Sequence, residues 1–344
     1  MAADSKVCDT SNATTTAGDA AVKASSTRRP VMITGASSGI GLELARHYAV
    51  QGSPLVLIAR NQQRLLDTAK QLSQLNPVYA SNPEFMTTLS LNVADASAVS
   101  EKLAECILDH GVPGLLINAA GVVNVGRFLE MSPDYFDDNL RIDFEGTVHT
   151  CRAIAPAMVT AGTGHIVNIA SVAGYLGIYG YTGYSAAKFA VMGFSEALRF
   201  EMKPLGVKVS VVCPPDTKTP GLAAERAARP TETEVIAGGI AAMDAAEVAR
   251  RIVRGINSQR FYIIIGASSK LYFRLKGLLP EVFFTIVDGQ VRKARKAPST
   301  SATSHSQTSA LHDISSPSAC LPEHIALSEG EQTLHPTVPA VGLR

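Results

Sequence analysis

A tyrosine and a lysine four residues apart, Tyr184 and Lys188, follow a serine, Ser171, in a stretch rich in small residues. If Tyr184 opens a helix, this spacing places its phenol and the Lys188 ammonium on one face. A cation beside a phenol stabilises the phenolate and lowers the pKa of the phenol. Ser171 ends an apolar run and could hold a carbonyl oxygen against that phenol. The three residues could protonate a ketone oxygen as hydride arrives, or run the reverse reaction.

The alternative for this pair is structural. A tyrosine four residues before a lysine is usually a packing ring beside a solvated charge. The spacing is nevertheless selective, because Tyr175, Tyr179 and Tyr181 have no lysine at the same offset. A catalytic interpretation therefore depends on the other motifs of the chain.

The composition indicates a globular intracellular protein. Of 344 residues, 46% are hydrophobic and 18% charged, which allows a sizeable core, and a net charge of +1 gives no argument for nucleic acid or an acidic partner. Five cysteines without metal-ligand spacing indicate neither a disulfide framework nor a metal site. The N-terminus lacks the apolar region of a secretory signal, and no stretch reaches the ~18–20 apolar residues of a membrane-spanning helix. We expect a cytoplasmic location.

Short apolar runs alternate with helical patterns from residue 30 to residue 265. Seven runs are expected as strands: 30–34, 54–59, 87–91, 114–118, 165–170, 207–213 and 261–265. Helices are expected between them, including a long one over 133–158 that is broken near Asn139, and one capped by Asp244 and Glu247. This pattern predicts an α/β fold, a single Rossmann-type doubly wound parallel sheet of about seven strands with flanking helices.

The chain ends differ from this pattern. Residues 1–28 are expected to be a disordered leader, 29–268 the nucleotide-binding domain, 269–296 an apolar and basic segment, and 297–344 a disordered tail. Two interpretations of 270–296 stay open. It is a helix packed on the domain or on an oligomer partner, or it is an interfacial helix on an anionic membrane surface.

A glycine-rich turn, Gly35-x-x-x-Gly39-x-Gly41, lies where the first strand gives way to a helix. Glycine there lets the backbone approach a pyrophosphate, and the helix N-terminus supplies amide donors. Ser37 and Ser38 add hydroxyl groups to the same place. The position of the turn after the first strand favours a dinucleotide site over a merely tight turn.

The end of the second strand indicates which dinucleotide binds. An acidic residue there would accept hydrogen bonds from the adenosine ribose of NAD. Here Ala59 leaves that role empty, and Arg60 follows, with Arg64 one helical turn later. Two guanidinium groups suit a 2′-phosphate, so we expect NADP(H).

Together these motifs resemble the short-chain dehydrogenase/reductase family over residues 30 to 266. The resemblance rests on the glycine turn, Asn118-Ala-Ala-Gly121 after the fourth strand, Ser171, and Tyr184 with Lys188. It implies that Tyr184 is the general acid or base, that Lys188 binds the nicotinamide ribose and lowers the Tyr184 pKa, and that Ser171 positions the substrate oxygen. The cofactor-binding residues expected from spacing and resemblance together are Gly35, Ser37, Ser38, Gly39, Ile40, Gly41, Arg60, Arg64, Asn92, Val93, Asn118, Gly121, Tyr184, Lys188, Pro214 and Thr217.

One departure from the family pattern concerns catalysis. The family commonly has an asparagine in the long helix, where it holds a water for proton relay. The aligned residue here is Asp143. A carboxylate can accept from that water or pair with Lys188, but its charge would alter the relay. We include Asp143 as a fourth catalytic candidate.

Residues 214–221, 176–180 and 201–204 resemble the branch of the family that reduces 3-ketosphinganine to sphinganine with NADPH. Eukaryotic members of this branch act at the cytosolic face of the endoplasmic reticulum, and a basic, apolar 270–296 would suit a lipid ketone taken from a membrane. The resemblance also implies a dimer or tetramer, and we expect 217–240 to be a mobile substrate lid. Two alternatives remain: another substrate for the same chemistry, such as a steroid, retinoid or small carbonyl compound, or a nucleotide-binding scaffold without turnover.

Overall fold

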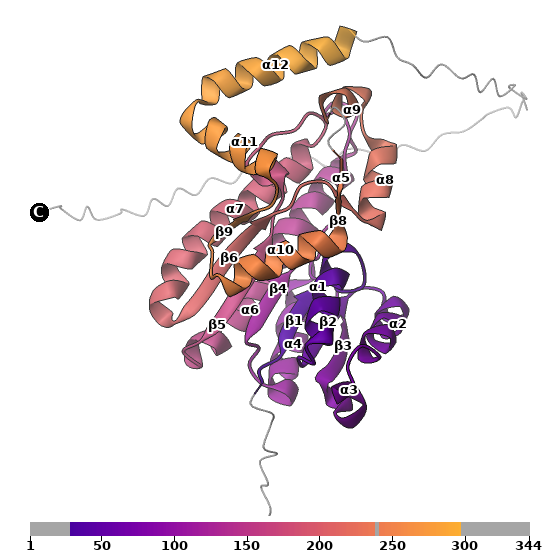
Figure 1. Ribbon diagram of the computed structural model, residues 1–344, viewed down its shortest axis with the longest axis vertical. Coiled ribbons are helices and arrows are strands. Elements are labelled where there is room, and N and C mark those ends of the chain that lie inside the picture. Colours follow the sequence, from indigo (N-terminus) through magenta and orange to yellow (C-terminus); the bar gives the residue numbers. More distant parts are fainter. Residues whose placement is uncertain (1–27, 238–240, 297–344) are drawn as a thin grey trace, which may run out of the picture. The chain divides into compact units, whose positions relative to one another are not determined.

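Seven strands form one parallel sheet in the computed structural model, which describes residues 28–237 and 241–296 (Figure 1). In chain order they are β1 (Val31–Thr34), β2 (Leu55–Ala59), β3 (Met86–Ser90), β4 (Leu115–Asn118), β5 (Gly164–Ile169), β6 (Val207–Cys213) and β9 (Tyr262–Ile264). Their spatial order is β3-β2-β1-β4-β5-β6-β9. The predicted doubly wound sheet is confirmed. The predicted disordered leader, apart from its last residue, and the predicted tail lie outside the described residues.

The strand order reverses between β1 and β4, whose ends lie side by side, with Thr34 paired to Asn118. In open parallel sheets, ligands bind beyond the carboxyl ends of the strands at such a switch point. The glycine turn after β1 and the loop after β4 are therefore where a dinucleotide site is expected.

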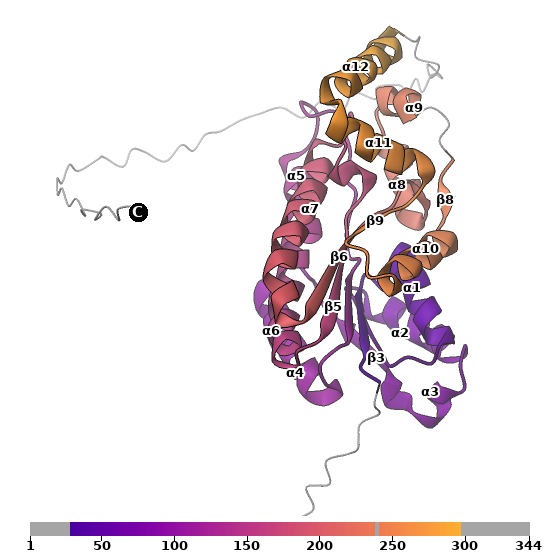
Figure 2. The same ribbon diagram turned by 60° about the vertical axis from the view of Figure 1, so that its left-hand side comes forward.

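Helices cover both faces of the sheet (Figures 1 and 2). On one face lie α1 (Gly39–Val50), α2 (Gln62–Ser73) and α10 (Ala245–Asn257), and on the other α4 (Ala96–His110), α6 (Gly146–Thr160) and α7 (Thr182–Met202). Fully buried Leu44 and Ile252 belong to the first apolar layer, and Leu103 and Ile154 to the second. Because both faces are covered, β1, β4 and β5 are buried along their whole length rather than at alternate residues.

The predicted long helix from 133 has the predicted break. It consists of α5 (Pro133–Asp138), a π-helical segment (Asn139–Glu145) and α6. The π segment contains two fully buried polar residues, Asn139 and Asp143. Such segments are frequent at functional sites because they re-aim side chains. Here the segment directs Asp143 towards α7.

Residues 217–237 carry more structure than a loop. A two-residue strand β7 (Thr217–Lys218) pairs with β8 (Met243–Asp244), and between them lie α8 (Pro220–Ala228) and α9 (Thr231–Ala237). Asp244 caps α10 as predicted, accepting hydrogen bonds from the amides of Ala246 and Glu247. The Glu247 carboxylate binds arginines of its own helix, so only the Asp244 half of the predicted capping box forms.

The segment after β9 forms α11 (Ala267–Leu278) and α12 (Pro280–Lys296). The Lys276 ammonium donates to the Tyr175 carbonyl at 2.6 Å, and the Tyr175 hydroxyl donates to the Ser269 carbonyl at 2.9 Å. Phe283 of α12 is buried in the same cluster as Leu176. The packed-helix interpretation is therefore confirmed for α11 and the start of α12. Within the described ranges, no helix is both long and apolar enough to cross a bilayer.

The remaining described elements are short. They are α3 (Val78–Ser81) and three single 3₁₀ turns, Pro83–Phe85, Val172–Gly174 and Lys203–Leu205. Tyr79 of α3 is buried, and its hydroxyl donates to the Ser53 carbonyl. This contact fixes α3 beside the N-terminal end of β2.

Candidate active site at the carboxyl end of the sheet

The three predicted catalytic residues lie together. Ser171 follows β5 and caps the 3₁₀ turn behind it, accepting a hydrogen bond from the Ala173 amide. Tyr184 and Lys188 stand one turn apart at the start of α7, and the Lys188 ammonium is 5.5 Å from the centre of the Tyr184 ring. The Ser171 hydroxyl hydrogen-bonds the Tyr184 phenol. A phenol and a hydroxyl side by side can hold one carbonyl oxygen.

Lys188 forms a buried ion pair with Asp143. The distance between the Lys188 ammonium and the Asp143 carboxylate is 3.3 Å, and the side chains are 6% and 0% exposed. Lys188 also donates to the Ile169 carbonyl, and Asp143 accepts from the Val122 amide at 2.7 Å. The structure thus brings the residue that departs from the family pattern into direct contact with Lys188, the predicted catalytic lysine.

The electrostatics of Tyr184 differ from the sequence-based expectation. Lys188 was expected to lower the pKa of Tyr184. Burial is the largest influence on this pKa and raises it, and the Asp143 charge raises it further, while the Ser171 hydrogen bond opposes them. In this geometry burial and the Asp143 charge outweigh the lowering expected from Lys188, whose ammonium is itself paired with Asp143. The phenol is therefore held protonated at neutral pH.

Asp143 itself is subject to opposing influences. Burial raises the pKa of its carboxyl group, and the Lys188 charge and the Val122 hydrogen bond act in the opposite direction. A buried carboxylate needs such partners, since removing a charge from water costs several kcal/mol, in order of magnitude, when it is uncompensated. The pair is therefore a single electrostatic unit beside Tyr184.

The glycine turn after β1 has the backbone that only glycine adopts easily. Gly35 and Gly39 have positive φ angles of 68° and 56°. A Cβ atom on Gly41 would lie 2.3 Å from the Gly35 carbonyl oxygen. The Thr34 hydroxyl accepts hydrogen bonds from the amides of Ala119 and Ala120, which fastens the turn to the loop after β4. This side-chain-free cradle at the N-terminus of α1 fits a pyrophosphate.

The side chains around the turn remain accessible. Ser37, Ser38 and Ile40 are partly exposed, and the Ser38 side chain does not cap α1. A Cβ atom on Gly39 would lie 3.1 Å from a methyl carbon of Thr219. The segment after β6 therefore borders the same cradle from the opposite side.

Pro214 and Thr217 shape that bordering segment through contacts of their own. The Pro214 carbonyl accepts from the Val172 amide, which ties the end of β6 to the Ser171 turn. The Thr217 hydroxyl donates to the Pro215 carbonyl at 2.7 Å, and Thr217 is buried. Both predicted cofactor residues thus lie between the glycine turn and the catalytic serine.

The two predicted phosphate-binding arginines lie at the carboxyl end of β2. Arg60 follows the strand, Arg64 is in the first turn of α2, and both side chains are exposed. Asn61, between them, caps α2 by accepting from the Arg64 amide at 2.8 Å. The cap fixes the backbone from which both guanidinium groups extend. The carboxyl end of β2 therefore has two cations, Arg60 and Arg64, and the strand itself ends without a carboxylate.

Asn92 and Val93 follow the neighbouring strand β3. Asn92 is exposed and accepts from the Ala94 amide, so its side chain shapes the turn at this edge. Val93 is buried, and its side chain packs so closely on Gly146 that a Cβ atom there would lie 2.6 Å away. The structure places both residues beside the Arg60 strand, as the sequence predicted.

Asn118 and Gly121, from the motif after β4, have different positions. The Asn118 side chain is 2% exposed, donates to Asn168 and accepts from Thr150. It is thus committed to the interior, and it supports the strand ends rather than facing the cofactor edge. Gly121 is exposed, and a Cβ atom on it would lie 2.8 Å from the Asp143 carboxylate.

The sequence analysis missed a second ionic cluster near Tyr184. Arg229, whose side chain is 3% exposed, pairs with Asp216 at 2.8 Å and with Glu225. Glu225 also accepts from the Tyr181 hydroxyl, and the Tyr181 and Tyr184 rings are 6.1 Å apart. Both carboxylates contribute to raising the pKa of Tyr184. The four-residue spacing of Glu225 and Arg229 was a visible signal, but their burial was not.

Comparisons with known proteins agree with this geometry. A family model described as short chain dehydrogenase matches residues 29–230. The chain is 34% identical to the 3-ketodihydrosphingosine reductase of Mus musculus, covering 74% of this chain and 76% of that protein. It is 32% identical to the protein of the same name from Dictyostelium discoideum, covering 75% and 80%.

A solved short-chain dehydrogenase from Sphingobium yanoikuyae, in complex with NADPH, has a TM-score of 0.60 at 23% identity. The match covers 81% of this chain and 100% of the Sphingobium yanoikuyae chain. At 23% identity, this likeness shows the fold alone. The chain belongs to the short-chain dehydrogenase family. It is an oxidoreductase acting on CH–OH groups or the corresponding ketones, as the Ser171, Tyr184 and Lys188 cluster allows.

Proposed function

We propose that this protein reduces 3-ketosphinganine to sphinganine with NADPH. The observation that carries the proposal is the contact of Ser171, Tyr184 and Lys188 at the carboxyl end of the sheet, beside the glycine turn. The curated relatives named 3-ketodihydrosphingosine reductase support the choice of ketone.

NADPH would be held by the glycine turn at its pyrophosphate and by Arg60 and Arg64 at its 2′-phosphate, and when bound it supplies the hydride. Ser171 and Tyr184 then hold the substrate oxygen between two hydroxyl groups. Tyr184 donates its proton to that oxygen, and Lys188, over its ring, stabilises the phenolate left behind. Because burial and Asp143 raise the pKa of Tyr184, the phenol stays protonated at neutral pH, which suits the direction of reduction.

The charge around the catalytic phenol favours an amino ketone. 3-Ketosphinganine carries an ammonium group next to its ketone, and Asp216 and Glu225 are the carboxylates near Tyr184 on the substrate side. They face one arginine, Arg229, so the cluster keeps an excess of negative charge. The Asp216 side chain is 36% exposed and is the accessible partner for an ammonium group.

The proposal extends to location and assembly. The Lys- and Arg-bearing helices α11 and α12 keep Leu271, Leu278 and Phe284 exposed, which supports peripheral contact with a membrane at the cytosolic face of the endoplasmic reticulum. Phe189 and Phe200 are 40% and 63% exposed and, eleven residues apart, share one face of α7, which supports a homo-oligomer built on α6 and α7. The assembly is checked by light scattering after gel filtration.

The test is NADPH oxidation by purified protein with 3-ketosphinganine, beside the Tyr184→Phe variant. Loss of the proton donor lowers kcat by about 10²–10⁴-fold, while NADPH binding by fluorescence titration stays unchanged. Wild-type turnover on a steroid or retinoid ketone, with none on 3-ketosphinganine, reassigns the substrate. NADPH binding without turnover on any ketone indicates a scaffold instead.

A further inference from the structure

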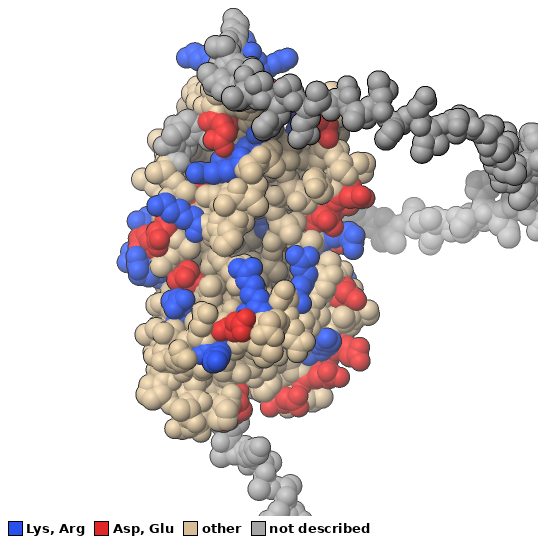
Figure 3. All heavy atoms as spheres, turned by 90° about the vertical axis from the view of Figure 1, so that its right-hand side faces the viewer, with Lys and Arg blue, Asp and Glu red and all other residues tan. Residues whose placement is uncertain are grey.

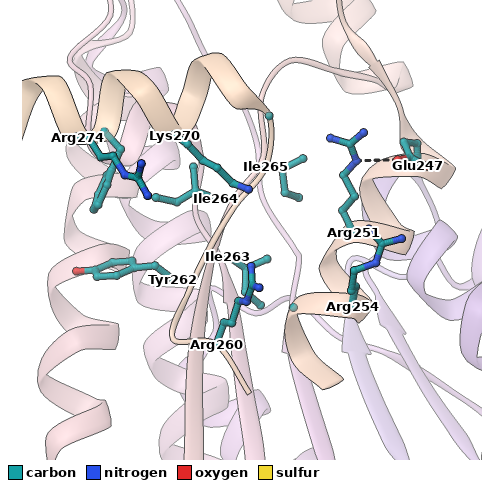
Figure 4. A pocket seen from close by; sticks show the side chains of 13 residues that line it. Glu247, Arg251, Arg254, Arg260, Tyr262, Ile263, Ile264, Ile265, Lys270 and Arg274 are labelled. Carbon is teal, nitrogen blue, oxygen red and sulfur yellow. Dashed lines mark hydrogen bonds and ion pairs between the residues drawn. The ribbon is translucent and has the colours of Figure 1, made fainter. Parts of the chain in front are cut away.

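A cleft of about 430 Å³ lies at the free edge of the sheet, between α10, β9 and the start of α11. Five basic residues line it: Arg251 and Arg254 of α10, Arg260 just before β9, and Lys270 and Arg274 of α11. Figure 4 shows Lys270 and Arg274 extending from α11, and Arg251 and Arg254 from α10 across the cleft. We call this the basic cleft.

The positive charge of the basic cleft is largely uncompensated. Glu247 is the one acidic residue in its lining, and it binds Arg251 at 2.7 Å (Figure 4). The other four cations have no ion-pair partner among residues 28–237 and 241–296. The N-cap residue of α11, Gly266, also lines the cleft, and no side chain caps that helix, so its positive dipole end adds to the charge.

This concentration of one sign is not a property of the chain as a whole. The whole chain has a net charge of only +1. On the face shown in Figure 3, acidic and basic side chains are interspersed with uncharged surface, and neither sign covers it. Several cations at short range without acids form a site for an anion with more than one acceptor oxygen, such as a phosphate group.

The outer face of α11 indicates that the phosphate belongs to a lipid. At about 100° per residue, Lys270 and Arg274 share one helical arc with Leu271 and Leu278. Both leucines are exposed, by 62% and 78%. The opposite arc, with Ser269 and Lys276, faces the protein. Cations that alternate with exposed leucines match the boundary between headgroups and acyl chains.

A second copy of this chain is the less suitable occupant. A two-fold contact at the β9 edge would bring the five cations of one cleft against the same five of the other. Like charges placed opposite one another across an interface cost several kcal/mol, in order of magnitude. The charge pattern therefore favours an anionic surface over self-association.

We propose that the basic cleft binds the phosphate group of an anionic phospholipid and so docks the free β9 edge of the sheet on a membrane. This inference rests on the membrane contact proposed above, and it is independent of the identity of the ketone. It adds α10 and β9, which precede the apolar and basic C-terminal segment, to the docking surface.

The experiment is vesicle flotation of the full chain with phosphatidylcholine vesicles, with and without phosphatidic acid. The cleft variant is Lys270→Glu with Arg274→Glu. The matched control is Lys70→Glu with Lys208→Glu, which makes the same change in charge at two exposed residues outside the cleft, neither of which has an ion-pair partner within the described ranges. Thermal unfolding of both variants checks that they are folded.

We expect binding to phosphatidic acid vesicles that weakens with salt, and at least about 30-fold weaker binding of the cleft variant, from about 1 kcal/mol per basic residue. The control should stay within about twofold of wild type. Equal losses in both variants, or none in the cleft variant, overturn the role of the cleft. Absence of vesicle binding by the wild type overturns the membrane contact itself.

Inorganic phosphate provides the second arm. If it raises the unfolding temperature of the wild type but not of the cleft variant, and phosphatidic acid vesicles do not bind, the site takes a free anion and the lipid source is wrong. Competition of phosphate with bound vesicles supports the proposal. Ketone reduction with detergent-dispersed substrate is measured separately, so failure of the enzymatic proposal is distinguished from failure of this one.

Discussion

Charged side chains at the active site are enclosed and paired, whereas those of the basic cleft are exposed and mostly unpaired. Lys188 with Asp143, and Arg229 with Glu225, are each less than 10% exposed. Lys270 and Arg274 are exposed at the protein surface. A buried charge requires a partner, because losing water costs more than most single contacts return. An exposed cation needs no protein partner, which leaves it available to a ligand.

The largest expected difference between the two regions is in stability. Arg229→Met leaves the buried Glu225 carboxylate without its cation, and we expect the free energy of unfolding to fall by about 3 kcal/mol. Arg260→Met, in the basic cleft, should change it by less than about 0.5 kcal/mol. Urea denaturation measures both. Equal effects would show that burial does not separate these two sets of charges.

The next expectation concerns Arg60, an exposed cation that we assign to a phosphate. Arg60→Asp removes a charge-assisted hydrogen bond of about 1.5–3 kcal/mol and should weaken NADPH binding by about ten- to a hundredfold, while NADH is affected less. Lys70→Asp, an exposed change farther along the chain on α2, is the control. Unchanged selectivity between the two cofactors would remove Arg60 and Arg64 from the cofactor site.

Asp143→Asn tests how the buried pair controls the catalytic phenol. The Asp143 charge raises the pKa of Tyr184, so its removal should lower that pKa. Oxidation of sphinganine by NADP⁺ needs the phenolate as base, and its rate rises with pH as the phenol ionises. The rising limb of the pH–rate profile should therefore move to lower pH in the variant. An unmoved limb would mean that Asp143 does not set the pKa of Tyr184.

The smallest effect is expected at the helix that contributes two arginines to the basic cleft. Asp244 caps α10 through the amides of Ala246 and Glu247. Asp244→Ala should cost about 1 kcal/mol of stability. Differential scanning calorimetry would show it as a lower Tm, with vesicle binding retained. A loss of vesicle binding at a temperature where the variant is folded would show that the cleft depends on this cap.

Much of the fold was predictable because its signals are local. Apolar runs and turn residues placed the seven strands within one residue at each end, and the strand over 207–213 has the predicted bounds. The break near Asn139 was also predictable, but its π-helical form was not. A local pattern reports that a helix is interrupted, whereas hydrogen-bond register depends on the packing around it.

The sequence by itself determined the parallel sheet, the glycine turn and the residues of the proposed catalytic group, because strand periodicity and a four-residue helical spacing operate over short distances. Only the tertiary structure decided which charges meet. It paired Lys188 with Asp143, buried Arg229 among carboxylates, turned Asn118 into the interior and gathered five cations from α10, α11 and the turn before β9. Electrostatic energy depends on distance and burial between residues far apart in the chain, which spacing along the sequence does not contain.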